Sequence, residues 1–468
     1  MYENVNEKFN QLPPDYPEDL LPAIQKEFLE SEKTIVVLDD DPTGTQTCYD
    51  VMVLTSWEVA LITAELRQQP SILYILTNSR SLPEAEAIHL ALEIGRNLKE
   101  AAKESQREVV VVSRSDSTLR GHFPAEVDAV AKALGFQGAV TVLVPAFIEG
   151  ARYTIDDVHY LVENEELVPV SDTPFAKDVS FGYQHANLKE WVEEKTRGLI
   201  KASEVNSVSI EDLRAGGPKV VAEKLEACAN GSVCIMNAAS YRDLEVGVLG
   251  LIMAERSGKK FLYRTSATFV PTRAGMVSGK LYVPQKEDTA SSHGSLVMVG
   301  SHVPKTTAQL AYLLKQGRHQ KLEIDVSQLL QSQDLSGEAS AIGAQVDAWL
   351  AAGEDVVVHT SRRLETGADA ESSLKINALV SSFLVAIVRG TSVRPKFIVA
   401  KGGITSSDLA SKGLSVQKAT VLGPVIPGVP VWKLHEESKF PGLIYVVFPG
   451  NVGDDKALTL VCEKFGAG

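Results

Sequence analysis

The sequence predicts an α/β protein with two domains, each built on a mainly parallel sheet flanked by helices. Three observations support this fold class. Short runs rich in Val and Ile alternate with longer helical patterns, and most of these runs are apolar on both faces, as in a parallel sheet covered by helices. The alternation also pauses once and restarts. The 468 residues allow about two to four domains of ordinary size.

The part of the chain before residue 281 contains most of the predicted strands. Two helical patterns lie between them, at 83–104 and 124–134, and each begins with proline, which suits a first helical turn. The predicted strands of this part are 34–39, 71–77, 108–113, 139–144, 232–236 and 260–264.

A polar segment rich in small residues, 281–294, interrupts the pattern and is the predicted linker. After it come predicted strands at 295–300, 321–326, 355–360 and 396–403 and predicted helices at 304–316, 336–353 and 371–390. The chain therefore divides into an N-terminal arm with an extended character (1–30), a first domain (31–285) and a second domain (286–468). We expect an active site in the cleft between the two domains.

The charge balance limits the classes of partner. The chain has 46 Lys and Arg against 60 Asp and Glu, a formal net charge of −14. General nucleic-acid binding needs an excess of basic residues, so it is excluded, whereas a local Arg cluster can still bind one small anion. No apolar run reaches the roughly 18 residues of a membrane span, and no signal peptide is present. Four cysteines without CxxC spacing suit buried thiols in a reducing cytosol, so a cytoplasmic location is expected.

Ligands of open α/β sheets bind at the carboxyl ends of the strands, so the residues there are the candidate site. The first strand ends in Asp39-Asp40-Asp41-Pro42-Thr43-Gly44. Three adjacent carboxylates repel one another unless a metal, a cationic substrate group or an Arg relieves them. A solvated acidic turn is the structural alternative.

The third strand runs into SRSDSTLRGHFP, which contains Arg114, Asp116 and Ser117. An Arg fork binds a carboxylate or phosphate, and Asp with hydroxyls binds OH groups, so the segment suits an anionic polyol. An N-cap within a surface ion-pair network is the alternative. Arg80 and Arg152 follow the second and fourth strands. That four strands deliver polar residues to one sheet edge is stronger evidence for a binding site than any single segment.

The second domain offers turns that suit phosphate. Ser301 follows its first strand, and although the segment superficially resembles a P-loop, the glycine spacing of that motif fails. A later strand ends in Gly402-Gly403-Ile404-Thr405, where backbone N–H groups can form an anion nest. Gly450 lies in a Pro-Gly turn near the end. A single such turn is usually only structural, but several in one domain favour a nucleotide, and the two domains together favour a kinase.

Several long motifs in the right order resemble those of the four-carbon acid sugar kinase family. They are DDPTGTQT, SRSDSTLRGHFPAE, GARYTIDDVHY, GSHVPKTTAQL and KGGITSSDLA, and they extend over nearly the whole chain beyond the arm. The resemblance implies an N-terminal domain for a tetronate-like acid and a C-terminal domain for ATP. Substrates known for the family include 3-oxo-tetronates, threonate, erythronate and 3-oxo-isoapionate.

The resemblance also implies roles for individual residues. Asp40, Asp41, Thr43 and Gly44 match the family's DD-x-TG element, and Arg114, Asp116 and Ser117 fall in its serine/aspartate motif. Ser301, Gly402, Gly403, Ile404, Thr405 and Gly450 match the nucleotide loops. Two departures concern the substrate: DDPTGT replaces the usual DDFTGA, and Ile404 stands where an acidic residue is common.

The hypothesis is phosphoryl transfer from ATP to a hydroxyl of a small sugar acid. Arg114, with Arg80 or Arg152, clamps the substrate carboxylate, and Asp41 or Asp116 orients the hydroxyl and acts as the base. Asp40 helps to hold the site together, and binding Mg²⁺ is one way in which it could do so. No residue is assigned as a dedicated metal ligand. The expected partners are the sugar acid and ATP, and neither nucleic acid nor a membrane is expected to bind. The expected oligomeric state is a homodimer.

Two other classes are weighed against the kinase. Asp39-x-Asp41-x-Thr43 also fits an aspartyl-nucleophile phosphatase, in which Asp39 attacks phosphate and Asp41 protonates the leaving group. That class leaves the glycine-rich second domain unexplained. The other alternative is a non-catalytic sensor of a sugar acid.

Overall fold

The computed structural model describes residues 2–277, 279–363, 365 and 370–467, and the chain forms two compact units. Unit 1 comprises Met1–Gly44 and Ser56–Gly279, and unit 2 comprises Thr45–Thr55 and Lys280–Gly468. The α/β fold class with two units and mainly parallel sheets is confirmed. The main part of the second unit begins at Lys280, one residue before the predicted linker 281–294.

Unit 1 is built on seven strands that are all parallel. The central strand β2 (Thr34–Asp39) is buried at all six positions, which explains why its sequence is apolar on both faces. The strands lie in the order β10 (Asn206–Val208), β11 (Val233–Met236), β6 (Val140–Val144), β12 (Phe261–Thr265), β5 (Val109–Arg114), β2 and β4 (Ile72–Leu76).

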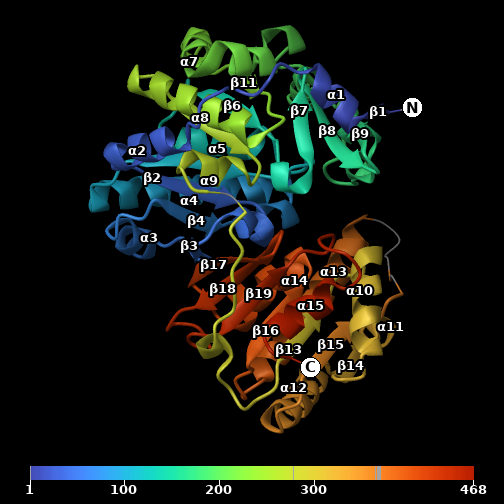
Figure 1. The fold of residues 1–468 in the computed structure, drawn as a ribbon. Coiled ribbons are helices and arrows are strands. Elements are labelled where there is room, and N and C mark those ends of the chain that lie inside the picture. The colour runs from blue at the N-terminus through green and yellow to red at the C-terminus, as the bar shows by residue number, and fades with distance from the viewer. Residues whose placement is uncertain (1, 278, 364, 366–369, 468) are drawn as a thin grey trace. The chain divides into compact units, whose positions relative to one another are not determined.

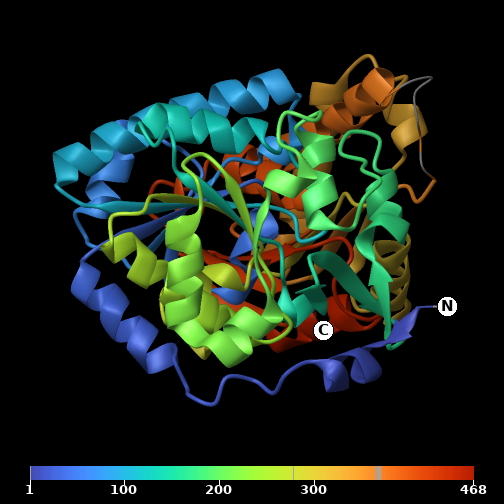
Figure 2. The ribbon, with the colours of Figure 1, turned by 90° about the horizontal axis from the view of Figure 1, so that it is seen from above.

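Helices cover both faces of this sheet, as Figure 2 shows for the upper and lower layers of unit 1. One group packs together through α4, and the other through α8. The first group is α3 (Val59–Leu66), α4 (Glu84–Ser105) and α5 (Ala125–Leu134). The second is α2 (Leu21–Ser31), α7 (Gly217–Ala227), α8 (Tyr241–Arg256) and α9 (Phe269–Arg273). A further helix, α6 (Leu188–Lys195), belongs to neither group.

The N-terminal arm is part of unit 1. Its first strand β1 (Glu3–Asn4) joins a small antiparallel sheet in the order β1, β9 (Glu166–Pro169), β8 (Val158–Glu163) and β7 (Arg152–Ile155). Helix α1 (Val5–Gln11) follows, and an extended stretch, dark blue in Figure 2, leads to α2. No strand was predicted for residues 152–169, so this small sheet is a feature that the sequence analysis missed.

Unit 2 contains a mixed sheet of eight strands, and residues 45–55 contribute its first strand. The sequence analysis placed these residues in the first domain, but β3 pairs with β17, with Val51 opposite Val421. The strands lie in the order β3 (Val51–Leu54), β17 (Lys418–Ile426), β18 (Val429–Leu434), β19 (Ile444–Phe448), β16 (Phe397–Lys401), β13 (Leu296–Val299), β15 (Val356–Thr360) and β14 (Gln320–Ile324). The first three pairings are antiparallel and the other four are parallel.

The helices of unit 2 pack in two groups, visible in yellow to red in Figure 1. The first is α12 (Leu335–Ala351), α13 (Ala370–Gly390) and α14 (Gly403–Asp408). The second is α10 (Pro304–Lys315) and α15 (Ala457–Lys464), which pack with the sheet around a core that includes Leu310, Phe397 and Phe465. A short α11 (Val326–Leu329) follows β14. Across the part of the chain that the structure describes, no helix combines the length and hydropathy that a bilayer crossing requires.

Candidate functional site

The carboxyl ends of β2, β4, β5 and β6 lie at one edge of the unit 1 sheet because these strands are parallel neighbours or share β12. The sequence therefore delivers Asp39–Asp41, Ser79–Ser81 and Arg114–Ser117 to the same edge. The short helical turns η1 (Pro42–Thr47) and η2 (Ser79–Ser81) reverse the chain there.

Arg80 joins three carboxylates at this edge. Its Nη2 lies 2.5 Å from Oδ1 of Asp40, and its Nη1 lies 3.4 Å from Oδ2 of Asp41 and 3.8 Å from Oδ1 of Asp116. The Arg80 side chain is only 16% exposed, so these ion pairs are shielded from solvent. The repulsion among the adjacent carboxylates, which the sequence identified, is relieved by Arg80 and Arg114.

Asp41 and Asp116 are held in their charged forms. Burial favours the neutral form of Asp41, but Arg80 and the hydrogen bonds of Thr43 outweigh it and lower the pKa. The Thr43 N–H and hydroxyl donate to Asp41 Oδ1 at 2.9 and 2.5 Å. Asp116 is likewise buried, yet Arg120 at 2.7 Å, Arg80 and the Thr118 hydroxyl hold its pKa well below the usual range.

Asp39 has the opposite character. Its side chain is fully buried, and burial raises its pKa to about 7 although Arg114 opposes this with Nη1 3.2 Å from Oδ1. A Cβ on Gly44 would lie 2.0 Å from Asp39 Oδ2, so glycine is required at position 44 for the carboxyl group to occupy its place. Arg114 is 4% exposed and already paired with Asp39.

Arg152 differs from Arg80, Arg114 and Arg120, which form ion pairs with carboxylates. It is the first residue of β7 (Arg152–Ile155). Its Nη1 donates to the carbonyl oxygen of Gly150 at 2.8 Å, and its guanidinium group lies over the Phe147 ring. Among the described residues no carboxylate forms an ion pair with it, and its buried Nε has no hydrogen-bond partner. Burial lowers its pKa, with Arg120 acting in the same sense and Asp116 opposing. Arg152 is thus a buried cation with donor capacity to spare and no carboxylate partner among the described residues; Arg114 Nε is likewise unpartnered, but Arg114 is paired with Asp39.

The remaining predicted residue of this unit, Ser117, is buried, and its carbonyl accepts from His159 Nε2 at 2.8 Å. The sequence analysis missed Arg264, whose Nη1 donates to Ser115 Oγ at 2.6 Å. It also missed Glu126, a buried acid on α5 whose pKa burial raises to about 7. Arg264 lies in β12 (Phe261–Thr265), so the rule applied to the other strand ends could have identified it.

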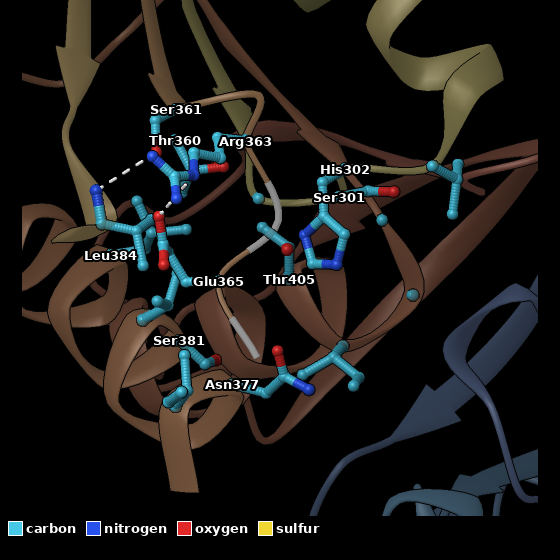
Figure 3. Close-up of a pocket in the computed structure, with 18 residues that line it drawn as sticks. Ser301, His302, Thr360, Ser361, Arg363, Glu365, Asn377, Ser381, Leu384 and Thr405 are labelled. Atoms are coloured by element: carbon cyan, nitrogen blue, oxygen red, sulfur yellow. Dashed lines mark hydrogen bonds and ion pairs between the residues drawn. The ribbon is translucent and has the colours of Figure 1, made fainter. Parts of the chain in front are cut away.

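Unit 2 contains a cavity of about 250 Å³ at the carboxyl ends of β13, β15 and β16 (Figure 3). Ser301 and the Gly402–Thr405 loop line it, so the structure brings these predicted residues together. Ile404 is half exposed beside them. The cavity also has an apolar part and further polar groups that the sequence analysis did not name: Val326, Ile376, Val380, Leu384, His302, Thr360, Ser361, Asn377 and Ser381.

Close packing of the backbone shapes the turns of this site. Gly402 has a φ of +119°, and a Cβ there would lie 2.9 Å from Ser301 Cβ. A Cβ on Gly300 would lie 2.3 Å from Thr405 Oγ1. Gly450 does not line the cavity, but a Cβ on it would lie 3.1 Å from Ser301 Oγ, so its turn adjoins the same serine. Glycine at positions 300 and 402 therefore lets these turns pack directly against Thr405 and Ser301.

The described residues contain no group of three or more His, Cys, Asp or Glu side chains arranged to hold a metal ion. The four aspartates of the unit 1 cluster, Asp39, Asp40, Asp41 and Asp116, are paired with arginines instead. Mg²⁺ that accompanies a nucleotide commonly keeps several waters and takes only one or two protein carboxylates, so it does not require such a group.

The two clusters differ in chemistry: the one in unit 1 consists of Asp and Arg side chains, and the one in unit 2 of glycine turns and hydroxyl groups beside a cavity. Comparison with known families agrees with this division. Residues 35–273 match the model of a sugar-binding N-terminal domain, and residues 296–458 match that of a nucleotide-binding C-terminal domain. The chain belongs to the four-carbon acid sugar kinase family.

Two curated relatives have been given an activity. The chain is 25% identical over 286 residues to a D-erythronate kinase of Heliobacterium modesticaldum, a match that covers 59% of each protein. It is 30% identical over 152 residues to a D-threonate kinase of Bordetella bronchiseptica, covering 31% of this chain and 35% of the relative. The chain therefore matches less than two thirds of the length of either relative.

Solved structures share the fold. A protein from Salmonella typhimurium LT2 has a TM-score of 0.65 at 16% identity, with 92% of this chain and 98% of that chain covered. A Haemophilus influenzae protein of the family DUF1537 has a TM-score of 0.60 at 17% identity, with 92% and 100% covered. These similarities establish the fold of the chain.

Proposed function

We propose that this chain is an ATP-dependent kinase that phosphorylates a hydroxyl group of a small, about four-carbon sugar acid. The observation that carries the proposal is that each of the two clusters falls within one family model, the Asp/Arg cluster in the sugar-binding domain and the glycine turns in the nucleotide-binding domain. The activities of the two curated relatives, on D-erythronate and D-threonate, support this substrate class.

The donor capacity of Arg152 makes it the main group for the substrate carboxylate. Arg80 and Arg114 have their charges already balanced by Asp40, Asp41 and Asp39, whereas Arg152 has no such partner among the described residues. A buried guanidinium gains most from an anion that it can bind with two parallel hydrogen bonds.

Asp41 and Asp116 are the groups that orient the acceptor hydroxyl and take its proton. Both are charged, and Asp116 is placed by the neighbouring Arg120 and Thr118. Their low pKa makes them weak bases, but a loose phosphoryl-transfer transition state depends on positioning more than on base strength. Asp40 holds Arg80 in place between them.

Ser301, Gly402, Gly403, Thr405 and Gly450 would hold the nucleotide, with backbone N–H groups of the turns donating to its phosphates. ATP would supply the transferred phosphoryl group, with Mg²⁺ accompanying the nucleotide. The apolar side chains Val380 and Leu384 suit the base, and Ile404 adds apolar surface where relatives often have an acid. The chain's part in catalysis is to bind the two substrates, exclude water and receive the hydroxyl proton.

The buried position of Asp39 disfavours the phosphatase alternative. An aspartyl nucleophile must be ionised and accessible, but Asp39 is 1% exposed, its pKa is raised to about 7 by burial, and it is paired with Arg114. Asp41, with its lowered pKa, is also a poor proton donor for a leaving group.

A substrate panel tests the proposal. The full chain with ATP and Mg²⁺ is assayed for ADP formation with erythronate, threonate, 3-oxo-tetronates and 3-oxo-isoapionate. We expect ADP only with a matching acid, and a loss of at least about a hundredfold in turnover in either Asp41→Asn or Asp116→Asn.

Asp178→Asn is the matched control, because Asp178 also pairs with Arg120, at 3.7 Å, but is not among the carboxylates that form ion pairs with Arg80. It should retain turnover. Unchanged turnover in both the Asp41 and Asp116 variants would contradict the assignment of the base. Phosphate release from phosphoesters without ATP use would favour the phosphatase, and binding without either reaction would favour a sensor.

A further inference from the structure

Lys401 ends β16, directly before the Gly402–Gly403 turn, and its side chain is completely buried. Its Nζ donates to the carbonyl oxygens of Pro449 and Gly450 at 2.5 and 3.3 Å. The ammonium group also lies 3.9 Å from the centroid of the Phe448 ring. The side chain therefore connects the strand that leads into one glycine turn with the backbone of the other.

A short hydrogen-bond path joins Lys401 to Ser301. The Gly450 carbonyl that accepts from Lys401 also accepts from Thr306 Oγ1 at 3.0 Å, and Thr306 Oγ1 lies 3.3 Å from Ser301 Oγ. Thr306 is itself fully buried on α10. The position of the Gly450 turn against Ser301 thus depends on two buried side chains, Thr306 and Lys401.

The charge of Lys401 is not balanced by the protein. Among the described residues no carboxylate forms an ion pair with it, and its contacts are carbonyl dipoles and an aromatic ring. Burial lowers its pKa to about 7, with Lys305 acting in the same direction. Burying an ammonium group without an anion is costly, so a purely structural role would be served at lower cost by a neutral side chain. An anion bound at the adjoining turns would supply the missing countercharge.

We propose that Lys401 is a positioning residue for nucleotide phosphate, which holds the Pro449–Gly450 turn against Ser301 and places a positive charge beneath the turns that receive the phosphates. This inference rests on the nucleotide-binding role proposed above and adds a residue that acts on the phosphates rather than on the base. It predicts that the effect of Lys401 depends on whether the ligand carries phosphate.

Calorimetric titration of the full chain with ADP and with adenosine tests the inference. Lys401→Met should weaken ADP binding by at least about thirtyfold, the loss usual when one partner of a buried charged contact is removed, and should leave adenosine affinity within about twofold. Lys401→Arg, which keeps the charge, should recover part of the ADP affinity. Thermal melts of each variant report whether it folds.

Lys439→Met is the matched control. Lys439 also donates to two carbonyl oxygens, those of Val388 and Arg389 at 2.9 and 2.5 Å, and lies over the Phe440 ring, but it is remote from the glycine turns in the hydrogen-bond network. Its substitution should leave both affinities unchanged. If Lys401→Met does not fold, Thr306→Val breaks the same path to Ser301 and should weaken ADP but not adenosine.

Three outcomes contradict the inference in different ways. ADP affinity that is unchanged in a folded Lys401→Met overturns it and leaves the kinase proposal standing. Equal losses for ADP and adenosine show a structural role instead. A wild-type chain that binds neither ligand overturns the proposed function and this inference with it.

Discussion

At the scale of single residues, the state of each arginine decides what it can do. Arg80 and Arg114 hold the acidic turn together, and their partners Asp40 and Asp39 lie 2.5 and 3.2 Å away. Arg152 has the same chemical group but no carboxylate partner in the described part of the chain. The sequence analysis identified all three arginines and gave Arg114 the leading role with Arg80 or Arg152 beside it, because the pairing of Arg114 with Asp39 depends on side-chain geometry that the sequence does not show.

Arg152 gives the residue-scale prediction. Arg152→Met should raise the KM for the sugar acid by about ten- to a hundredfold, the cost of losing hydrogen bonds to a charged group, while the KM for ATP stays the same. Arg152→Lys should lie between, since Lys keeps the charge but loses the planar fork. Steady-state kinetics with each substrate varied in turn measures both effects.

The control for this prediction is Arg107→Met. Arg107 donates to Thr34 Oγ1 at 3.0 Å, and Thr34 begins β2 whereas Asp39 ends it, so Arg107 lies at the other end of the strand. This variant should change neither KM. An Arg152→Met enzyme with an unchanged KM for the acid would show that another group binds the carboxylate.

At the scale of elements, α5 carries a buried acid into the site. Glu126 lies in the first turn of α5 and is 9% exposed. Burial, together with the nearby charge of Asp40, raises its pKa to about 7, against the opposing hydrogen bond from Ser79. A buried carboxyl group with a raised pKa binds its proton more tightly in the folded state than in the unfolded state.

The linkage gives the second prediction. Below a pH of about 4 the carboxyl group is protonated in both states, and as the pH rises towards 7 the unfolded state ionises first, so stability is lost through that window. Glu126→Gln removes this loss. The variant should match wild type near pH 4 and be more stable at pH 8, by at most about 3 kcal/mol.

Urea unfolding at both pH values measures the difference in the free energy of unfolding between wild type and Glu126→Gln. The titration of other groups contributes equally to both proteins and cancels in this difference. Glu84→Gln, at an exposed position in the first turn of α4, serves as the control and should show no such difference. A Glu126→Gln protein that is less stable than wild type at pH 8 would show that the carboxylate is bound as an anion.

How far sequence reasoning reached also depends on the element. Strand β2 was predicted with the bounds that it has in the structure. Its four central residues form an apolar run, and all six of its residues are buried. Strand β3 was not predicted, and its residues were included in the first domain, since its place is set by pairing Val51 with Val421, far along the chain. Ser301 and the Gly402–Thr405 loop were predicted from local turn chemistry. Lys401 was given no role because its partners at 449 and 450 are brought to it only by the sheet.

At the scale of the whole molecule, the net charge of −14 acts on every anionic ligand. A sugar acid and ATP must approach a surface that repels them before they reach Arg152 or the glycine turns. The cations of the unit 1 cluster are largely matched by carboxylates, so they offset this field only at short range. Repulsion between exposed charges is screened by salt, whereas buried contacts are screened much less.

The last prediction therefore concerns ionic strength. Raising it from about 10 to 150 mM shortens the Debye length from about 30 to 8 Å and should increase kcat/KM for the sugar acid, by roughly twofold. A basic protein that binds anions through an exposed cationic surface shows the opposite trend. Adenosine, which is neutral, provides the control, and its affinity should not change over the same range. A fall in kcat/KM with added salt would mean that a local positive field around Arg152 extends into solvent and outweighs the acidity of the chain.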